Sequence, residues 1–513
     1  MKKRIIAALL VLCMLSVCLV SCGGGNDKPV ITKAPTGEQG SKEDEPSKWD
    51  DVNFDGTTLY INLNEYVFSA VTKAGTEHSN KFLVGPDDYT TDAVQNAVYE
   101  RNTKVQNKLG IDVKYSYEGS LAANIPPVID GWVLAATEDT PDIVVTMNYA
   151  LVRAALSGNL RNALGKTEDN YFDFSDSHWY YDFMKATSLS NDKIYALSSD
   201  YFIDEFRMAF VTLVNNDLYN EIFANEGGVD TLYETIEAGD WDYDELSRTA
   251  QMAYVDAGTV GQQDDEDTFG VAADSTMSTR AMFYSSGLDI FQYDESGAPS
   301  YVEDTTALHD YTDTIQRLFN QNYVLYTTAE KDTTTFLNGG SLYAIGQYML
   351  MLEGSTIQNM GTGQSVSVIP HPKYDKEGEY QTLVSDNAAG GAILMSTTDF
   401  SAATAFIQMM TEESGEMFKQ YYEVALKYKL SSGSGQLKIL DILKNSITSP
   451  TAFLYDNYCA RTLGASTEFR TIYDIILESV TGNTNTFTST WEGQIGAMQK
   501  QLADTVTKFK TLD

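Results

Sequence analysis

The chain has 513 residues, of which 43% are hydrophobic and 21% charged, as in a globular protein long enough for more than one core. Its formal net charge is −37. A surface this acidic repels phosphate backbones, which argues against nucleic acid as a partner. It also argues against an acidic substrate unless a local basic pocket offsets the charge.

The N-terminus has the pattern of a targeting segment. The basic start MKKR precedes an apolar run over residues 5–20, which is short of the about 20 residues of a membrane span. The run ends in LVSC at 19–22, which resembles the lipobox of bacterial lipoproteins. The resemblance implies a signal peptide over residues 1–21 and a lipid on Cys22. Acyl chains such as palmitate would then hold the protein on a membrane without spanning it.

Residues 22–51 are predicted to be a flexible tether that begins at the lipidated cysteine, because they offer almost nothing to bury. No later run approaches membrane length, so the body is expected at the extracytoplasmic face of the cell membrane. Cys13 and Cys18 leave with the signal peptide, and Cys459 then remains without a cysteine partner. An internal disulfide and a paired-cysteine metal site are excluded.

Strands and helices alternate along the first part of the chain. Short β-type runs lie at 57–63, 111–117 and 141–147, and the last has the continuous apolar core of a buried parallel strand. A helical period between the first two runs has Thr91 as its candidate N-cap and stops at Gly110. Strand, helix and strand with short connections predict an α/β sheet.

Two later strands and a terminal helix extend this pattern. A run over 208–216 leads directly into a helix, and a run over 388–396 precedes another. The chain ends in an amphipathic helix whose apolar residues are spaced by three or four positions: Trp491, Ile495, Met498, Leu502, Val506 and Phe509.

The stretch EAGDWDYDELSRTA, residues 237–250, is crowded with carboxylates and raises the question of an acidic active site or a metal loop. Gly239 is expected to end one helix. Asp242 and Glu245 form a capping-box pattern at the start of the next, where acidic residues meet the helix dipole favourably and Trp241 packs on the entry. The stretch is therefore predicted to be a helix start and not an active site.

No catalytic motif stands out elsewhere. The four histidines are isolated, and the sequence lacks a nucleophile elbow and a phosphate-binding loop. Asp264, Asp265, Glu266 and Asp267 are contiguous and lack the alternating spacing of a calcium loop, so a solvated acidic loop is favoured over a cation site. We expect no enzyme activity, no metal and no cofactor.

Six blocks of the sequence, in order, carry a family resemblance: residues 97–115, 141–164, 211–223, 232–254, 365–396 and 421–446. The chain resembles the extracellular solute-binding proteins of ABC importers, of the carbohydrate-type family found as lipoproteins in Gram-positive bacteria. Departures are small: Ala163 stands where a turn residue is usual, and Asp242 replaces a capping threonine. The resemblance covers roughly residues 55–510.

The resemblance implies an α/β, two-lobed, periplasmic-binding-protein-like fold whose lobes are joined by crossing hinge strands, with ligand between the lobes. Crossings are expected near 211–215, 388–393 and 449–453. The N-terminal lobe would comprise residues 52–209 plus 393–450, and the C-terminal lobe residues 210–392 plus 451–513.

The resemblance also implies ligand-binding positions. Gly346-Gln347-Tyr348 aligns with the family's Gly-x-Trp, whose aromatic ring commonly lies under a sugar, so Tyr348 is the leading candidate and Gln347 accompanies it. Asn215 is a candidate whose alternative role is to cap the following helix. The remaining candidates follow a strand, precede the first crossing or lead into the return strand: Asn148, Tyr149, Asp200, Tyr201, Asp386 and Asn387.

Together these features predict a monomeric substrate-binding lipoprotein that captures a small neutral solute, foremost a mono- or oligosaccharide. It would deliver the solute to the permease subunits of an ABC importer and touch the membrane through its lipid anchor only. A surface glycan-active enzyme and an adhesin lipoprotein without a transport role are the alternatives.

Overall fold

The computed structural model describes residues 47–64, 80–119, 124–165, 169–327, 331–352, 365–426, 434–447, 471–482 and 484–512. The signal peptide, Cys22, Cys459 and the predicted crossing at 449–453 lie outside these residues. Residues 51–513 cluster as one unit, separate from residues 1–50. No helix in the described part of the chain is both long and apolar enough to cross a membrane.

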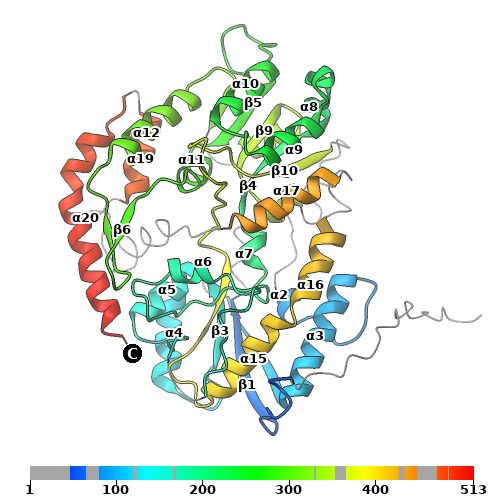
Figure 1. Cartoon of the computed structure of the whole chain (residues 1–513), viewed down its shortest axis with the longest axis vertical. Helices are drawn as coiled ribbons and strands as arrows, with labels where there is room; N and C mark the ends of the chain where they lie inside the picture. The colour runs from blue at the N-terminus through cyan, green and yellow to red at the C-terminus, as the bar shows by residue number, and fades with distance from the viewer. Residues whose placement is uncertain are drawn as a thin grey trace, which may run out of the picture. The chain divides into compact units, whose positions relative to one another are not determined.

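A four-stranded sheet combines three early strands with one late strand (Figure 1). The strand order is β11-β3-β1-β2, with β1 (Thr57–Asn64) parallel to β2 (Ile111–Glu118) and β3 (Ile143–Met147). β11 (Ala389–Ile393) pairs antiparallel with β3. Every residue of β3 is buried, as its continuous apolar run predicts.

Helices cover this sheet, and α3 (Ala93–Leu109) shows how local sequence fixes their ends. Its N-cap is Asp92 and not the predicted Thr91, because the Asp92 carboxylate accepts hydrogen bonds from the backbone N–H groups of Val94 and Gln95 at 2.8 and 3.1 Å. The helix ends at Gly110, which takes the left-handed conformation at φ 62°. The other helices of this part are α2 (Asn80–Leu83), α4 (Ile125–Ala135), α5 (Asn148–Leu156), α6 (Tyr181–Ala186), α7 (Asp204–Arg207), α15 (Phe400–Glu412), α16 (Gly415–Lys419) and the π-helical turn η6 (Gln420–Leu426).

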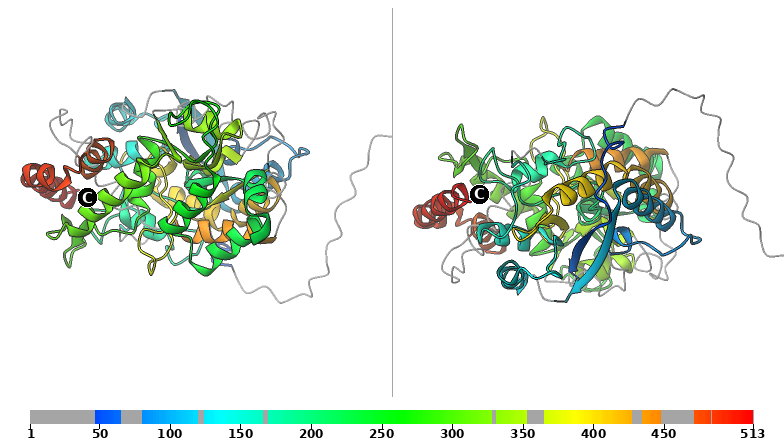
Figure 2. Two further views of the ribbon diagram at one scale, coloured as in Figure 1. Left: turned by 90° about the horizontal axis from the view of Figure 1, so that it is seen from above. Right: turned by 90° about the horizontal axis from the view of Figure 1, so that it is seen from below.

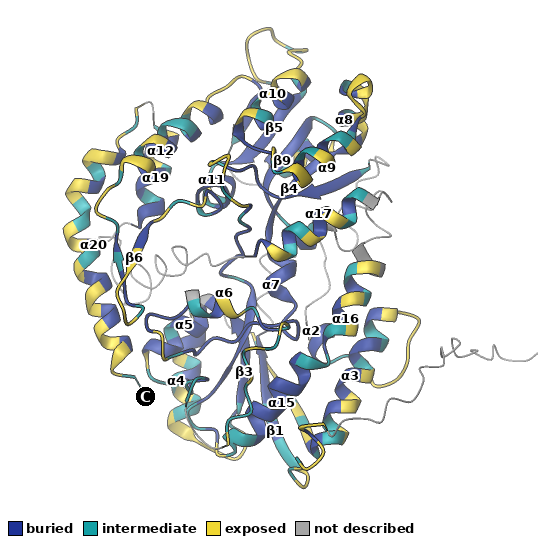
Figure 3. Ribbon diagram, in the orientation of Figure 1, coloured by how far each residue is buried: buried dark blue, intermediate teal, exposed yellow. Residues whose placement is uncertain are grey.

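A five-stranded sheet forms the second core, in the order β10-β4-β9-β5-β8. Buried residues follow both sheets in Figure 3. β5 (Phe269–Asp274) is parallel to β8 (Val324–Thr327) and β9 (Ser341–Tyr348), whereas β4 (Phe210–Asn215) is antiparallel to β9 and to β10 (Val366–Ile369). The carboxyl ends of β5, β8 and β9 therefore share one edge of the sheet.

The helices of the second core include α17, which the sequence analysis assigned to the other lobe. They are α8 (Asn216–Ile222), η4 (Ala224–Glu226), α9 (Val229–Ala238), α10 (Tyr243–Ala253), α11 (Met277–Tyr284), α12 (Thr306–Phe319), α13 (Lys331–Leu337), η5 (Met349–Leu352), α17 (Ser434–Asn445), α19 (Ile472–Thr481) and α20 (Phe487–Lys510), with the hairpin β6 (Phe291–Tyr293) and β7 (Pro299–Tyr301). α17 packs on α9 and β10. Gln436 of α17 donates a hydrogen bond to the Val368 carbonyl of β10 at 2.9 Å.

Two predicted lobe boundaries therefore need correction. Residues 434–447 pack with the five-stranded sheet, although the prediction assigned 393–450 to the first lobe. The predicted boundary at 392/393 falls inside β11, all of which pairs with β3 in the four-stranded sheet. Below, the first lobe means the four-stranded sheet with its helices, and the second lobe means the five-stranded sheet with its helices.

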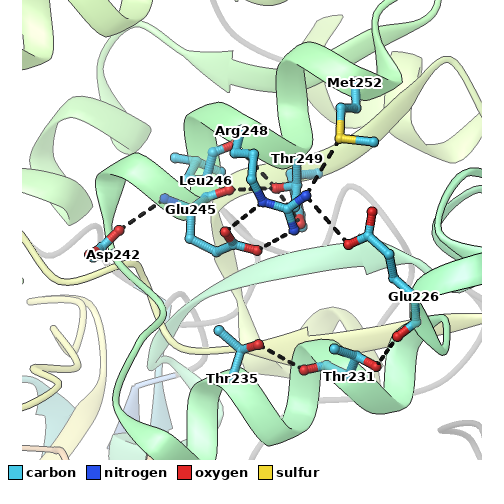
Figure 4. Close-up of polar contacts among 10 residues, drawn as sticks. Glu226, Thr231, Thr235, Asp242, Glu245, Leu246, Arg248, Thr249 and Met252 are labelled. Carbon is cyan, nitrogen blue, oxygen red and sulfur yellow. Dashed lines mark hydrogen bonds and ion pairs between the residues drawn. The ribbon is translucent and has the colours of Figure 1, made fainter.

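The acidic stretch 237–250 is a helix junction (Figure 4). Gly239 ends α9 at φ 81°, and the Asp242 carboxylate caps α10 by accepting a hydrogen bond from the Glu245 N–H at 2.9 Å. The reciprocal half of the predicted capping box is replaced, because the Glu245 carboxylate pairs with Arg248 at 2.7 Å. Trp241 is fully buried and donates to the Pro370 carbonyl at 3.0 Å. The carboxylates therefore build helix ends and surface ion pairs.

Candidate functional site

Among the described residues, two short segments that carry the chain between the sheets run side by side. The Ser385 N–H donates to the Met208 carbonyl at 3.1 Å, and the Phe210 N–H donates to the Leu383 carbonyl at 2.8 Å. One segment opens β4 and the other leads into β11. The predicted crossings near 211–215 and 388–393 thus fall on β4 and β11. Each of these strands follows one of the two paired segments, which we call the connections.

The carboxyl ends of strands from both sheets meet these connections. Met147 at the end of β3 lies opposite Ala389, and Tyr348 at the end of β9 lies opposite Phe210. In open α/β sheets, ligands bind outside the carboxyl ends of strands at such switch points. The candidate site therefore lies where Tyr348 approaches the second connection at Ser385.

Tyr348 places a half-buried ring at this edge. The ring lies against Phe210 with centroids 4.6 Å apart, and its hydroxyl is 3.5 Å from the Ser385 hydroxyl of the second connection. Burial raises the pKa of the Tyr348 hydroxyl; the charge of Asp386 adds to this, and Arg280 opposes it. Asp386 and Arg280 are therefore near enough to Tyr348 for their charges to change its pKa.

Arg280 is a candidate site residue that the sequence analysis did not identify. It lies on α11, with its guanidinium carbon 4.8 Å from the ring centroid of Tyr473 on α19. Burial has the largest single effect on the pKa of Arg280 and lowers it, but the charge of Asp386 together with Tyr473, Tyr284 and Tyr348 leaves the pKa above its usual value. The guanidinium of half-buried Arg280 thus lies over an aromatic ring, and the charge of Asp386 is near enough to raise its pKa. We call Arg280, Tyr348, Asp386 and Tyr473 the crossing cluster.

Gly346 explains how α11 comes so close to β9. It has φ 75°, and a Cβ there would lie 2.7 Å from the Cα of Ser278 on α11. The Ser278 hydroxyl donates to the Ile345 carbonyl at 2.7 Å, which ties the start of α11 to β9. The glycine of Gly346-Gln347-Tyr348 therefore allows the approach that brings Arg280 next to Tyr348.

Gln347, a predicted ligand contact, points away from the crossing cluster because β-strand side chains alternate. Its side-chain amide donates to the Asp332 carboxylate of α13 at 2.9 Å and accepts from the Thr333 hydroxyl at 3.1 Å. Only 7% of Gln347 is exposed. It holds α13 against β9, so both polar atoms of its amide have hydrogen-bond partners within the second lobe.

Asn148 also has a side-chain hydrogen-bond partner within the protein. It begins α5 and is fully buried, and its amide donates to the Glu205 carboxyl group of α7 at 2.8 Å. Ser198 donates to the same oxygen at 2.7 Å. Burial raises the pKa of Glu205 to about 8, although these two hydrogen bonds lower it. The sequence predicted that Asn148 directly follows β3, as it does. It could not show that the Asn148 amide is hydrogen-bonded to Glu205.

Asp200 forms a polar contact between the lobes. Its carboxylate lies 2.8 Å from His178 Nδ1, accepts from the Tyr180 hydroxyl at 3.1 Å, and is 3.8 Å from Lys444 Nζ of α17. The hydrogen bond to Asp200 raises the pKa of His178, against the effect of burial. The Lys444 ammonium also lies over the Phe418 ring of α16, 3.9 Å from its centroid. Asp200 thus fixes the loop before the crossing.

Two other candidate ligand-binding residues, Tyr201 and Asn215, have structural roles. Tyr201 is 1% exposed, and its ring lies beneath the buried Arg101 guanidinium at 5.0 Å, so it has no free face for a ligand here. Asn215 takes the alternative role that the sequence allowed, because its side chain accepts from the Leu218 N–H and caps α8. Asn387 is half-buried beside Asp386, whereas the Tyr149 side chain lies outside the described part of the structure.

The acidic loop lines a cavity of about 500 Å³ with Phe269, Lys331 and Asn338. Two of its carboxylates accept hydrogen bonds from the backbone, Asp264 from the Thr259 N–H at 2.7 Å and Asp267 from the Ala257 N–H at 2.9 Å, and Asp265 pairs with Lys331 at 3.2 Å. Among the described residues, no group of three or more histidine, cysteine or acidic side chains could hold a metal ion.

Comparison with known proteins identifies the fold. No family model and no curated protein matches the sequence. A cyclo/maltodextrin-binding protein, solved with maltotetraose, is 15% identical, covers 89% of this chain and 97% of its own, and gives a TM-score of 0.51. The galacto-N-biose-/lacto-N-biose I-binding protein of an ABC transporter from Bifidobacterium longum, solved with lacto-N-biose, is 10% identical, covers 89% and 98%, and gives 0.52. The chain has the fold of these binding proteins, and the predicted two-lobed α/β class is confirmed.

Proposed function

We propose that this protein is the substrate-binding lipoprotein of an ABC importer, which captures a mono- or oligosaccharide between its two lobes and delivers it to the permease subunits. The first lobe comprises residues 52–209 together with 389–426, and residues 210–388 belong to the second lobe. The second lobe holds the five-stranded sheet, α17, α19 and α20. The protein acts as a monomer at the extracytoplasmic face, and the lipid on Cys22 anchors it there.

The crossing cluster is the observation that carries this proposal. A sugar ring has apolar C–H faces and a rim of hydroxyls, so its site needs an aromatic face with donors and acceptors around it. Tyr348 supplies the ring, Arg280 a planar set of donors and Asp386 an acceptor. Asn387 lies beside this group and adds an amide.

The comparisons support the same class of ligand. The cyclo/maltodextrin-binding protein was solved with maltotetraose bound, and the galacto-N-biose-/lacto-N-biose I-binding protein with lacto-N-biose. Closure of the lobes would let both strand-end edges contact one solute, with the connections at Met208–Phe210 and Leu383–Ser385 as the hinge.

A panel of neutral oligosaccharides tests the function. We expect at least one to raise the unfolding temperature, because a ligand at 100 times its Kd stabilises the native state by about 2.7 kcal/mol. Product analysis of the same mixtures should show no turnover. Hydrolysis of any glycan would favour the surface enzyme, and a panel with neither stabilisation nor turnover would favour the adhesin.

The anchor is tested separately. Replacing Cys22 with serine removes the sulfur that would carry the lipid, so the protein should appear in the medium or remain unprocessed in the membrane. Cell fractionation with mass determination of the mature chain measures both outcomes, and Cys459→Ser is the matched control. Mature Cys22→Ser protein that stays membrane-bound at the wild-type level would refute lipid anchoring at this residue.

A further inference from the structure

The C-terminal helix α20 belongs to the second lobe along most of its length. It packs against α12, α19 and β7. Trp491, near its start, lies against Tyr301 of β7 with ring centroids 5.6 Å apart, and Gln499 accepts from the Tyr301 N–H at 3.0 Å. Figure 1 shows α20 running along one side of both sheets, and the views of Figure 2 place it at the same end.

The last turn of α20 reaches the first lobe. Phe509 is 1% exposed, and its ring meets Tyr195 edge to face at 5.4 Å. Just beyond the helix, the Leu512 carbonyl accepts a hydrogen bond from the Lys193 ammonium. The helix therefore ends in a buried aromatic contact with residues 193–195.

Residues 193–195 are fixed to the four-stranded sheet. The Ala163 N–H donates to the Ile194 carbonyl at 2.7 Å, and Leu197 exchanges backbone hydrogen bonds with Gly391 of β11 at 2.8 and 2.9 Å. A force on Tyr195 is therefore transmitted to the first lobe.

The β6–β7 hairpin makes a second contact with the same segment. The Asn191 N–H donates to the Ser296 carbonyl at the hairpin tip at 2.9 Å. Lys510 at the end of α20 donates to the Ser296 hydroxyl at 2.8 Å, which joins the hairpin to the helix. Helix and hairpin thus approach the first lobe as one element.

This element lies beyond the crossing cluster as seen from the two connections. Asp386 directly follows the connection at Leu383–Ser385, and its charge raises the pKa of Arg280, whose guanidinium carbon lies 4.8 Å from the ring centroid of Tyr473 on α19. α19 in turn packs on α20. The lobes are therefore joined on two sides of the cluster, by the connections on one side and by α20 with the hairpin on the other.

We propose that α20 and the β6–β7 hairpin form a strap that holds the lobes together across the outer side of the crossing cluster and favours the closed arrangement. Opening about the connections separates Phe509 from Tyr195 and exposes both rings. The strap thus adds to closure without touching the solute. Since apparent affinity scales with the population of the binding-competent form, releasing the strap weakens binding.

Small-angle scattering of the ligand-free protein tests the strap without reference to any solute. Phe509→Ala and Tyr195→Ala, which cut the same contact from opposite lobes, are each expected to increase the radius of gyration. The radius of gyration of the double variant should be little larger than that of either single variant, because both substitutions remove the same contact. Lys508→Ala, exposed on the same turn, is the matched control. Met498→Ala, buried further back on α20, controls for lost stability.

A second measurement rests on the proposed function. With a sugar identified from the panel, Phe509→Ala and Tyr195→Ala should weaken binding by about five- to tenfold, the scale of one aromatic pair, and the two controls should not. A wild-type radius in both strap variants, or an equal increase in Met498→Ala, would overturn the strap. If no sugar binds but the radius still increases in the strap variants, the strap stands and the proposed function falls.

Discussion

Replacing Glu205 with glutamine is expected to stabilise the protein at alkaline pH and to remove much of the pH dependence of its unfolding. Burial is the main cause of the raised pKa of Glu205, about 8 against 4.5 for a free glutamate, and the nearby Asp204 adds to it. Below pH 4.5 the folded and unfolded states both hold the proton. Between pH 4.5 and 8 only the folded state does, so stability falls as pH rises; above 8 it levels off.

The expected size follows from the difference between the two pKa values. Each unit corresponds to about 1.4 kcal/mol, so Glu205→Gln should gain roughly 3 to 5 kcal/mol over wild type at pH 9 and little at pH 4. The glutamine carbonyl can still accept from Asn148 and Ser198, which donate to one oxygen of Glu205. Denaturant unfolding at pH 4, 7 and 9 measures the effect.

Exposed Glu138 provides the control, since Glu138→Gln should leave the pH profile as in wild type. A Glu205→Gln variant that is less stable than wild type at pH 9 would show that the buried group is ionised and held by a partner. An unchanged pH slope would show that other groups set it.

Replacing Tyr348 with alanine is expected to weaken sugar binding by about 1 to 3 kcal/mol, the scale of a buried aromatic anchor. The ring packs on Phe210 and supplies the stacking face of the crossing cluster. Tyr348→Phe should lose much less, because the Tyr348 hydroxyl is 3.5 Å from Ser385 and that hydrogen bond is weak. Titration calorimetry with the sugar identified by the panel gives the affinities.

Tyr117, half exposed on β2 of the first lobe, is the matched control for removing an aromatic ring. Tyr117→Ala should bind as wild type does. Wild-type affinity in Tyr348→Ala, with the fold intact by circular dichroism, would remove Tyr348 from the site and shift attention to Arg280 and Asp386.

The sequence alone determined the features that depend on neighbours along the chain. The apolar run of β3, the stop at Gly239 and the cap at Asp242 are all found as predicted. These features are local, because a strand's burial, a left-handed glycine and a side chain that accepts from a nearby N–H each involve a few consecutive residues. The order of such elements was enough to predict an α/β sheet, and the family resemblance of the ordered blocks implied the two-lobed arrangement.

Tertiary structure decided which side chains remain available for a ligand. Asn148 and Gln347 follow the expected strands, yet Glu205 and Asp332, which are distant in sequence, occupy their amides. Arg280 carries no local signal and enters the site only because Gly346 lets α11 approach β9. Sequence patterns report whether a position is buried, whereas a polar group's partner is set by which elements meet. The lobe that α17 joins was decided in the same way, because its apolar face could cover either sheet and only its contacts with α9 and β10 show which one it covers.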